Sequence, residues 1–478
     1  MEPDGNKVAN GGRMSAEERL GTRRVGIIGT YGQGNLGDEA LFVAFTQWVG
    51  EHAPQIVPIA LCVNPRYIEQ TYGVSAYPVS GRYAATRRSA ETLGQGAASF
   101  APERQHTQSR GAGRRLIGRL RRTVARSMPA VAQWFRRVRR DVQGALAAAR
   151  FLPRQVRMAR ALDAVIVLGG GQIHDFWDGP FGYPVTLFSW ALASRLTRRP
   201  FAILSVGAVE LVHGMSRRLV RATFRWSNPA TVRDRGSAHE VADLGVARAC
   251  PIYPDLAWGL DPAGFLGDPR GTAGQRHPAP PECSSPRTVG VSPMAYRHPQ
   301  LWAAGDAEAY ARYVGTLAAF CDRLVSRGYD VVLFPTQILS DALAARDVLE
   351  RISPDLTQHV RLWPVDGIAA LVRCLSSVDV VVASRFHGVL LSLLAGRPVL
   401  SLGYQHKCTA LLEALGEGQF GLDLHDCSEQ ALWERFEQLA GQFSAYAARL
   451  RSHAEENRRK LHAQYQSYFS TLWPGKSA

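Results

Sequence analysis

The sequence predicts an α/β protein with two Rossmann-like domains that face a cleft, and three observations support this prediction. Short apolar runs alternate with amphipathic helical segments along most of the chain, which is typical of βα units and a parallel sheet. A stretch rich in Pro and Gly, residues 262–286, divides these units into two series and predicts an interdomain linker. A length of 478 residues suits two large domains.

The first series of strands lies within residues 22–261, after a polar segment at residues 1–21 that we expect to be a disordered tail. Residues 81–160 interrupt the strand pattern and predict a basic helical insertion in this N-terminal domain. The predicted strands of the domain are Val25–Ile28, Ile56–Val63, Ala164–Leu168, Phe201–Val206 and Ala230–Val232.

The second series lies within residues 287–478, and we expect its last part, Ser428–Phe469, to form helices that close the structure. Ligands of parallel sheets bind beyond the carboxyl ends of the strands, so the residues directly after each strand are the candidates for a functional site. The predicted strands of this C-terminal domain are Val289–Ser292, Val331–Phe334, Val360–Trp363, Val378–Ala383 and Val399–Leu402.

The composition is that of a globular protein, and its basic character comes from one segment. The chain is 46% hydrophobic and 20% charged, with a formal net charge of +15. Residues 81–160 hold 19 Arg and three acidic residues, so they carry +16, and the remaining 398 residues carry −1. A basic protein suggests nucleic-acid binding. That segment explains none of the motifs at the strand ends, however, and we expect no nucleic-acid partner.

We expect a cytoplasmic protein. No apolar run reaches the roughly 18 residues that span a bilayer, and the first twenty residues lack the apolar core of a secretory signal. The seven Cys show neither a CxxC pair nor a zinc spacing, which favours reduced thiols and no metal site.

Residues 81–160 leave two hypotheses open. Arg and apolar residues alternate there at helical spacing, which suits a helix lying on an anionic membrane. In that case the protein would be peripheral at the inner face of the membrane. The alternative is a helical insertion with a solvated Arg face.

A glycine-rich turn follows the first predicted strand. Residues 32–37 (GQGNLG) match the G-x-G-x-x-G pattern of dinucleotide-binding turns, and we place the next helix from about Asp38, which would cap it. The second strand ends at Asn64 without the acidic residue that binds a ribose, and no Lys-Ser/Thr pair marks a phosphate loop. NAD is therefore disfavoured. Backbone contact with an anion or a sugar remains open, as does a plain tight turn.

A second glycine turn, Gly169–Gly171, follows the predicted strand that ends at Leu168. His174, Asp175 and Asp178 come directly after it, together with two aromatic residues. Aromatic rings stack on the C–H faces of sugars, and carboxylates accept hydrogen bonds from their hydroxyls. The segment therefore predicts a carbohydrate site, with a glycine turn and a surface loop as the alternative.

Two strand ends carry cations. Arg233 follows one strand, where it can bind a carboxylate or phosphate or simply pair with Asp234 at the surface. Residues 384–388 (SRFHG) lie between a strand and a helix predicted at Val389–Ala395. The open N–H groups and the dipole of that helix favour an anion, and its His titrates near neutral pH. A His bonded to a backbone carbonyl is the alternative.

Lysine usage adds one more candidate. The chain has four Lys and 52 Arg, and we place Lys7, Lys460 and Lys476 in the terminal tails. Lys407 is then the one Lys that we place in the folded body. Either a compact ammonium is required at this position, or its presence there is due to chance.

Together and in this order, these motifs resemble the polysaccharide pyruvyl transferase family. The resemblance covers residues 22–80 and 160–420 and leaves out residues 81–160. The family usually has Leu where this chain has Phe386, which is a conservative apolar difference. The matching segments are residues 34–40 (GNLGDEA), Gly169–Gly171, Ser205–Gly207, Val232–Asp234, Asp255 in residues 253–257 (YPDLA), Ser384–Gly388 and Lys407.

The resemblance implies a fold like the GT-B glycosyltransferases and an enzyme that works without a cofactor. Such an enzyme moves a pyruvyl group from phosphoenolpyruvate onto a sugar of a polysaccharide or its lipid-linked precursor, forms a cyclic ketal and releases phosphate. A nucleotide-sugar glycosyltransferase on the same architecture is the alternative, and it would need a nucleobase pocket. The expected donor residues are Arg233, Arg385, Phe386, His387, Gly388 and Lys407. The expected acceptor residues are Gly34, Asn35, Asp38, Gly170, Gly171, His174, Asp175 and Asp178.

The chemistry of this reaction fits the residue types. Phosphoenolpyruvate carries nearly three negative charges, so at least two cations should converge on it. Protonation of its methylene carbon requires an acid first and a base later, and we predict His387 as the acid with Arg385 beside it. A helix N-terminus and Arg385 disfavour the imidazolium, so we expect a charged His387 mainly in the donor complex. His174, Asp175 or Asp178 would bind the acceptor or take its proton.

Overall fold

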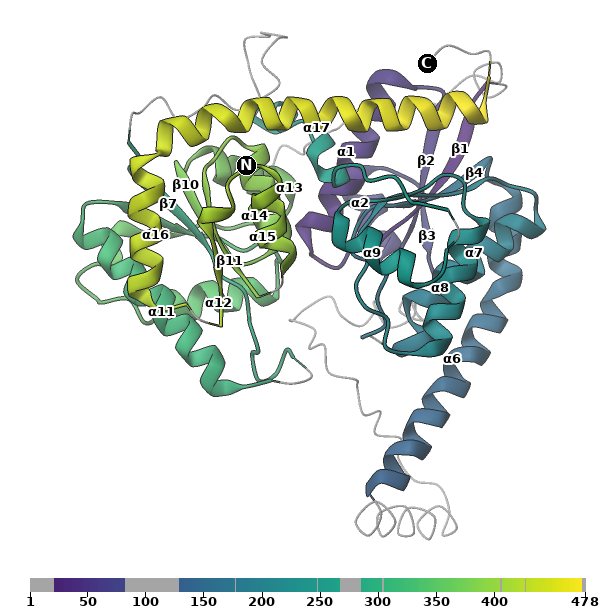
Figure 1. Ribbon diagram of the computed structural model, residues 1–478, viewed down its shortest axis with the longest axis horizontal. Coiled ribbons are helices and arrows are strands. Elements are labelled where there is room, and N and C mark those ends of the chain that lie inside the picture. Colours follow the sequence, from purple (N-terminus) through teal and green to yellow (C-terminus); the bar gives the residue numbers. More distant parts are fainter. Residues whose placement is uncertain are drawn as a thin grey trace, which may run out of the picture.

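Two parallel six-stranded sheets, each flanked by helices, form the body of the protein (Figure 1). The computed structural model describes residues 21–81, 129–266 and 285–474, apart from residues 177, 247, 303, 304, 405 and 426, and it describes no side chains at 129–138. The predicted pair of Rossmann-like domains is confirmed. The predicted tail, most of the linker and residues 82–128 lie outside the described residues.

The first sheet has the strand order β3-β2-β1-β4-β5-β6. Its central strands are buried along their whole length, which explains why they read as continuous apolar runs. The strands are β1 (Arg23–Ile28), β2 (Ile56–Cys62), β3 (Ala76–Pro78), β4 (Ala164–Leu168), β5 (Phe201–Val206) and β6 (Ala230–Val232). The helices are α1 (Leu36–His52), α2 (Pro65–Tyr72), α6 (Pro129–Arg160), α7 (Tyr183–Leu196), α8 (Gly214–Trp226) and α9 (Arg235–Asp243), with short η3 (Gly179–Phe181), η4 (Leu256–Gly259) and α10 (Ala263–Leu266).

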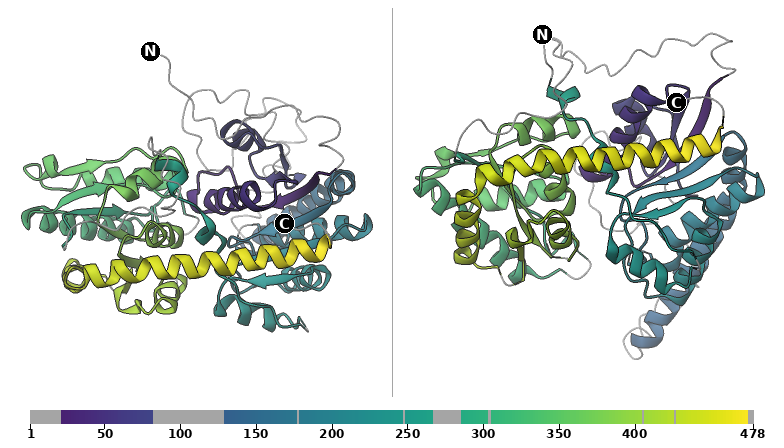
Figure 2. Two further views of the ribbon diagram at one scale, coloured as in Figure 1. Left: turned by 90° about the horizontal axis from the view of Figure 1, so that it is seen from above. Right: turned by 45° about the horizontal axis from the view of Figure 1, so that its top comes forward.

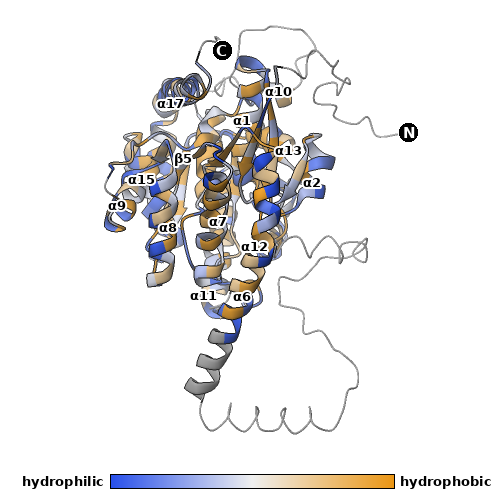
Figure 3. Ribbon diagram, turned by 90° about the vertical axis from the view of Figure 1, so that its right-hand side faces the viewer, coloured by the Kyte–Doolittle hydropathy of each residue, from blue (hydrophilic) through white to orange (hydrophobic). Residues whose placement is uncertain are grey.

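The second sheet repeats the arrangement with the order β12-β11-β10-β7-β8-β9. In both domains, buried hydrophobic residues pack between the sheet and the helices that cover it (Figure 3). The strands are β7 (Thr288–Ser292), β8 (Asp330–Leu333), β9 (Val360–Leu362), β10 (Val380–Ala383), β11 (Val399–Gly403) and β12 (Gly421–Asp423). The helices are α11 (Ala307–Ser326), α12 (Ser340–Leu349), α13 (Ile368–Ser376), α14 (Phe386–Leu394), α15 (His406–Ala414), α16 (Glu429–Gly441) and α17 (Phe443–Leu472), with short η5 (Thr357–His359) and η6 (Gly418–Phe420).

Helix α6 confirms a helix in the predicted basic insertion. Its second half packs on α7, where Gln155 Nε2 donates to Ser189 Oγ at 2.9 Å and Phe151 and Ala159 are buried. This half is the crossover that leads from the first strands of the sheet to β4, so it belongs to the domain itself. Its first half projects beyond the domain (Figure 1).

Helix α17 starts in the second domain and packs across the first (Figure 2). Its Tyr465 ring meets Phe45 of α1 with centroids 5.4 Å apart, and Gln464 Nε2 donates to Thr231 Oγ1 at 2.8 Å. Helices were expected here, but Lys460 lies on α17, paired with Glu456 at 2.6 Å, so its predicted place in a tail is wrong. The helix ties the two domains together. None of the helices in the described ranges has the length and apolarity to cross a bilayer.

Candidate active site

The predicted donor and acceptor halves touch where the two domains meet. Gly37 at the start of α1 lies so close to His387 of α14 that a Cβ on it would be 2.0 Å from His387 Cγ. Beside this contact the backbone pairs across the domains: Leu36 N donates to Thr336 O at 3.1 Å and Ile338 N donates to Gly34 O at 2.8 Å. The loops after β1 and β8 therefore form one interdomain contact.

The turn after β1 is shaped by Asn35. Its Oδ1 accepts a hydrogen bond from Gly37 N at 3.2 Å, so Asn35 caps α1, and the prediction that Asp38 caps the helix is wrong. Asp38 lies in the first turn, where the helix dipole favours a carboxylate. It accepts from Asn35 Nδ2 at 2.9 Å, and its Oδ1 lies 3.6 Å from where a Cβ on Gly170 would be. The two glycine-rich turns therefore lie side by side.

Arg233 is buried between the domains, with 7% of its side chain exposed. Its Nη1 donates to Asp255 Oδ2 at 3.0 Å and its Nε donates to Asp234 Oδ2 at 3.3 Å. The guanidinium carbon lies 4.3 Å from the centre of the Phe386 ring, which belongs to the other domain. The pair with Asp234 that the sequence offered as the alternative is present, but Arg233 itself is buried and not solvated. A Cβ at Gly207 would come within 2.6 Å of Arg233 Nε, so glycine is required there.

Arg385 is held by a carboxylate. Its Nε donates to Asp341 Oδ2 at 2.5 Å and its Nη2 to Asp341 Oδ1 at 2.7 Å, and Asp341 is fully buried. Burial lowers the pKa of Arg385, and the Asp341 charge more than offsets this, so the pKa is raised. Two nitrogens of the Arg385 guanidinium thus donate hydrogen bonds to Asp341. The arrangement holds the loop before α14 in shape, and binding of an anion by Arg385 stays a prediction.

His387 lies in the first turn of α14 with its ring mostly buried. Its Nε2 is 3.8 Å from Asp255 Oδ2 and has no hydrogen-bond partner among the described residues. Burial is the largest cause that lowers the pKa of His387, the Asp255 and Asp38 carboxylates raise it, and Arg233 and Lys407 lower it. The net direction is downward, as the sequence suggested. The main cause is burial and not Arg385.

Lys407 completes a group of cations around Phe386. Its Nζ lies 6.0 Å from the centre of the Phe386 ring. Burial, and after it the charge of Arg233, lowers the pKa of Lys407 to about 8. Since like charges gather here in a partly dry environment, a bound anion would relieve their repulsion.

The N-terminus of α14 carries no side-chain cap. Arg385 is its N-cap residue but makes no side-chain capping bond, so the first N–H groups of the helix are available for a ligand. Gly388 allows Thr336 to approach closely, since a Cβ there would lie 3.3 Å from Thr336 Cγ2. Thr336 Oγ1 is buried and has no hydrogen-bond partner in the described part of the chain.

The loop after β4 brings His174 toward the same cations. Burial lowers the pKa of His174 to about 4; the Asp175 carboxylate raises it in part, and the Lys407 charge adds a smaller lowering. The ring stacks on Phe176 with centroids 4.2 Å apart, and its Nδ1 has no hydrogen-bond partner among the residues described. His174 is therefore neutral near pH 7 and can accept a proton only weakly.

Asp175 points into its own domain. Its carboxylate accepts from Val212 N at 3.2 Å and from His213 N at 2.9 Å, and its Oδ2 is 2.8 Å from His213 Nδ1. It thus shapes the loop before α8. Asp178 is exposed at the start of η3, and Gly171 is exposed in its turn. A role of Asp175, Asp178 or Gly171 in acceptor binding stays a prediction.

A comparison with known families identifies the chain. The family model described as polysaccharide pyruvyl transferase matches residues 35–406. The chain belongs to this family. This pyruvyl transferase family member is therefore an enzyme of the transferase class that acts on polysaccharide.

Solved structures show the fold of this transferase. A protein from Listeria monocytogenes described as a UDP-N-acetylglucosamine 2-epimerase aligns with a TM-score of 0.54 and 11% identity, covering 96% of this chain and 98% of that one. A glycosyltransferase from Rickettsia africae aligns with a TM-score of 0.50 and 9% identity, covering 95% and 100%. The transferase has the two-domain GT-B fold.

Sequence reasoning missed three residues of the transferase's site. Asp341 and Thr336 follow β8, and this position after a strand is the feature by which the sequence could have identified them as site residues. Asp255 belongs to the family-like segment at residues 253–257, but no role was assigned to it. Asp341 and Asp255 each bind an arginine that is distant in the sequence.

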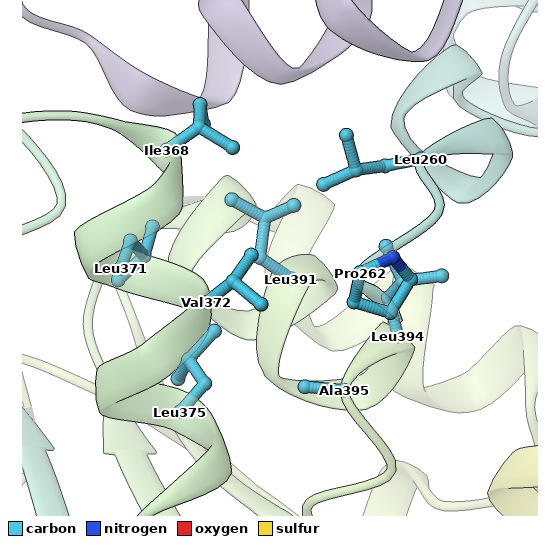
Figure 4. A pocket seen from close by; sticks show the side chains of 9 residues that line it. All are labelled: Leu260, Pro262, Ile368, Leu371, Val372, Leu375, Leu391, Leu394 and Ala395. Carbon is cyan, nitrogen blue, oxygen red and sulfur yellow. The ribbon is translucent and has the colours of Figure 1, made fainter. Parts of the chain in front are cut away.

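A pocket between the domains of the transferase is lined by apolar side chains and by none of these charged residues (Figure 4). Leu260 and Pro262 face Val372 of α13 and Leu391 of α14 there. A pocket without polar lining suits interdomain packing and not an anionic substrate. The described residues also hold no group of three or more His, Cys, Asp or Glu that could bind a metal ion.

Proposed function

We propose that this transferase moves a pyruvyl group from phosphoenolpyruvate onto a sugar of a polysaccharide or its lipid-linked precursor, with formation of a pyruvate ketal and release of phosphate. The observation that carries the proposal is the gathering of Arg233, Lys407 and His387 around Phe386 at the open N-terminus of α14. Family membership supplies the reaction class.

The donor fits this group by charge. Phosphoenolpyruvate brings a carboxylate and a phosphate, and Arg233 and Lys407 supply two cations in a partly desolvated place where charge attraction is strong. The first N–H groups of α14 and the Thr336 hydroxyl would bind remaining oxygens of the anion. The arriving anion would raise the pKa of both Lys407 and His387 and so charge them fully in the complex.

The proposed reaction starts with proton transfer from His387 to the methylene carbon of the donor, which becomes the ketal methyl group. The central carbon then develops positive character, and a first sugar hydroxyl attacks it and loses its proton. Loss of phosphate and attack by a second hydroxyl, which also loses its proton, complete the ketal. One of the two released protons restores His387, and the other leaves with phosphate or solvent.

The acceptor would approach from the first domain. The proposed donor residues lie beside the two glycine-rich turns, which contribute Asp38, Asn35 and the backbone of Gly34 and Gly170. His174 lies near Lys407. These groups offer carboxylate, amide and backbone partners for sugar hydroxyls. They are the acceptor residues that we propose on geometric grounds.

Docking at an anionic membrane would suit a lipid-linked acceptor. Helix α6 directly precedes β4 and runs antiparallel to it. Its N-terminal end therefore extends toward the carboxyl edge of the sheet, where the site lies. Its outward face carries Arg139 and Arg150 with the exposed Val142 and Leu146. We propose that this face rests on the cytoplasmic surface of the membrane.

Phosphate release from phosphoenolpyruvate, measured against a panel of sugar acceptors, tests the proposal. We expect release to depend on both an acceptor and His387. A thermal shift with phosphoenolpyruvate and none with nucleotide sugars would support the donor assignment. The opposite pattern would favour the glycosyltransferase alternative, which shares the GT-B fold.

A further inference from the structure

Asp255 is a buried carboxylate that touches both domains, with 4% of its surface exposed. Its Oδ1 caps η4 by accepting from Ala257 N at 3.0 Å. Its Oδ2 accepts from Arg233 Nη1 at 3.0 Å and lies 3.8 Å from His387 Nε2. The segment that carries it is fixed beside β6, since Tyr253 N donates to Val232 O at 2.9 Å. The carboxylate is therefore held in one position.

The pair of Asp255 and His387 exists only where the two domains meet. Asp255 follows the first sheet, whereas His387 opens a helix of the second. His387 Nε2 has no hydrogen-bond partner among the described residues, which leaves the Asp255 carboxylate as its nearest acidic group at 3.8 Å. Separation of the domains would remove the carboxylate and return the imidazole to the influence of Lys407 alone.

The charges that face His387 come from four groups. Asp255 and Asp38 favour its charged form, and Arg233 and Lys407 oppose it. Without Asp255, the imidazolium would face Arg233 with one carboxylate fewer to balance it. A buried imidazolium with too few carboxylates would lose its proton before the donor could receive it.

We propose that Asp255 is the positioning residue of His387, whose carboxylate orients the ring and stabilises its imidazolium form once the domains meet. The inference rests on the proposed function, in which His387 is the acid. Asp255 itself touches no reacting atom in this account. It acts through His387, so the enzyme assembles a competent acid only when its domains are in contact.

Titration of His387 in the full-length protein tests this inference without turnover. The ring signals of the protein labelled with ¹³C-histidine are followed by NMR against pH, and the His387 signal is assigned by its loss in His387→Ala. In Asp255→Asn we expect the pKa of His387 to fall by about one unit, as for loss of an adjacent opposite charge. Asp255→Glu, which keeps the charge, should restore most of this shift and also controls for a fold defect.

The matched control is Asp234→Asn. Asp234 also pairs with Arg233 and caps a helix through Ser237 N, but its carboxylate does not face His387. If Asp255 only supported Arg233, both variants would change donor affinity alike and leave the His387 titration in place. An unshifted titration in Asp255→Asn would overturn the inference.

Activity separates this inference from the proposed function. Because His387 must be protonated to act as the acid, the rate falls as pH rises through its pKa, and the alkaline limb of kcat should move to lower pH in Asp255→Asn by the same amount. A wild-type enzyme that releases no phosphate from phosphoenolpyruvate with any acceptor would sink the proposed function. The NMR shift would still decide the role of Asp255.

Discussion

Lys407 is a cation whose charge changes with pH near 8. Burial, aided by Arg233, lowers its pKa to about 8, so the free enzyme loses this charge as the pH rises through that value. The affinity for an anionic donor should therefore depend on pH through Lys407.

We predict that the Kd for phosphoenolpyruvate rises above pH 8, by up to about tenfold per pH unit, because binding must then take up a proton. Lys407→Met should bind more weakly at pH 7 and show a shallower profile from pH 8 to 9.5, because only His387 would then take up a proton on binding. Isothermal titration calorimetry measures both. An equally steep profile in Lys407→Met would assign the titration to another group.

The pair of Arg385 and Asp341 gives a prediction about stability. Arg385→Met would leave the fully buried Asp341 carboxylate without its partner, which we expect to cost about 3 kcal/mol of unfolding free energy. The double variant Arg385→Met/Asp341→Leu should recover most of that loss. Urea unfolding of the two single variants and the double variant measures the coupling. Strictly additive losses would show that the pair is unimportant for stability.

The residues of the site could be predicted where they directly follow a strand that the sequence predicts. Arg233, His387, Lys407 and Gly170 follow predicted strands, and the structure brings them together. Asp341 could not be assigned, because its bond to Arg385 joins loops 44 positions apart. Asn35 was passed over as a cap because Asn and Asp are equally good at that task.

Among the elements, α1 and α14 meet at Gly37, and this contact can be broken by a single methyl group. A Cβ there would overlap His387 Cγ, so the ring would have to move. Gly50 of the same helix has no atom within 4 Å of such a Cβ and serves as a matched control.

We predict that Gly37→Ala lowers kcat about 100-fold, as a misplacement of about 1 Å in a catalytic group does, while Gly50→Ala stays near wild type. Steady-state phosphate release measures both variants. Wild-type turnover in Gly37→Ala would mean that the observed contact of His387 with α1 has no part in catalysis.

Helix α6 gives a prediction about the membrane. Val142 and Leu146 are 53% and 49% exposed on its outward face, between Arg139 and Arg150. The double variant Val142→Glu/Leu146→Glu should weaken binding to vesicles rich in phosphatidylglycerol at least tenfold, roughly the loss expected from two apolar contacts and two added negative charges.

The control for this experiment is Leu196→Glu. Leu196 is 61% exposed at the end of α7, near the opposite edge of the sheet, and should not touch the membrane. Vesicle binding by the α6 variant equal to that of wild type would leave the solvated Arg face as the explanation of this segment.

Ten strands were predicted from apolar runs and all ten are present; most are buried on both faces and so carry continuous apolar residues, whereas β9 is a partly exposed edge strand. Strands β3 and β12 were missed. Each is a three-residue edge strand whose sequence, AYP in β3 and GLD in β12, contains Pro, Gly or Asp, which are depleted in strands, so no apolar run marked it. Helix α14 starts three residues before its predicted start, so Phe386, His387 and Gly388 belong to its first turn.

At the scale of the whole molecule, the site exists because two sheets present their carboxyl edges to each other. The backbone bonds between residues 34–36 and 336–338 and the long helix α17 hold this arrangement. The sequence predicted two domains from the linker. It could not predict that α17 packs on the first domain, because an amphipathic pattern shows that one helix face is buried but not which element covers that face. It also could not predict that the loops touch, since that depends on the placement of both domains.

The central claim is that His387 protonates the methylene carbon of phosphoenolpyruvate in a ketal-forming transfer. The most direct measurement is the reaction in D₂O with an accepting sugar, followed by NMR of the product. We predict a ketal whose methyl group carries one deuterium from solvent, and no ketal from His387→Ala. A ketal methyl without solvent deuterium, or full ketal formation by His387→Ala, would contradict it.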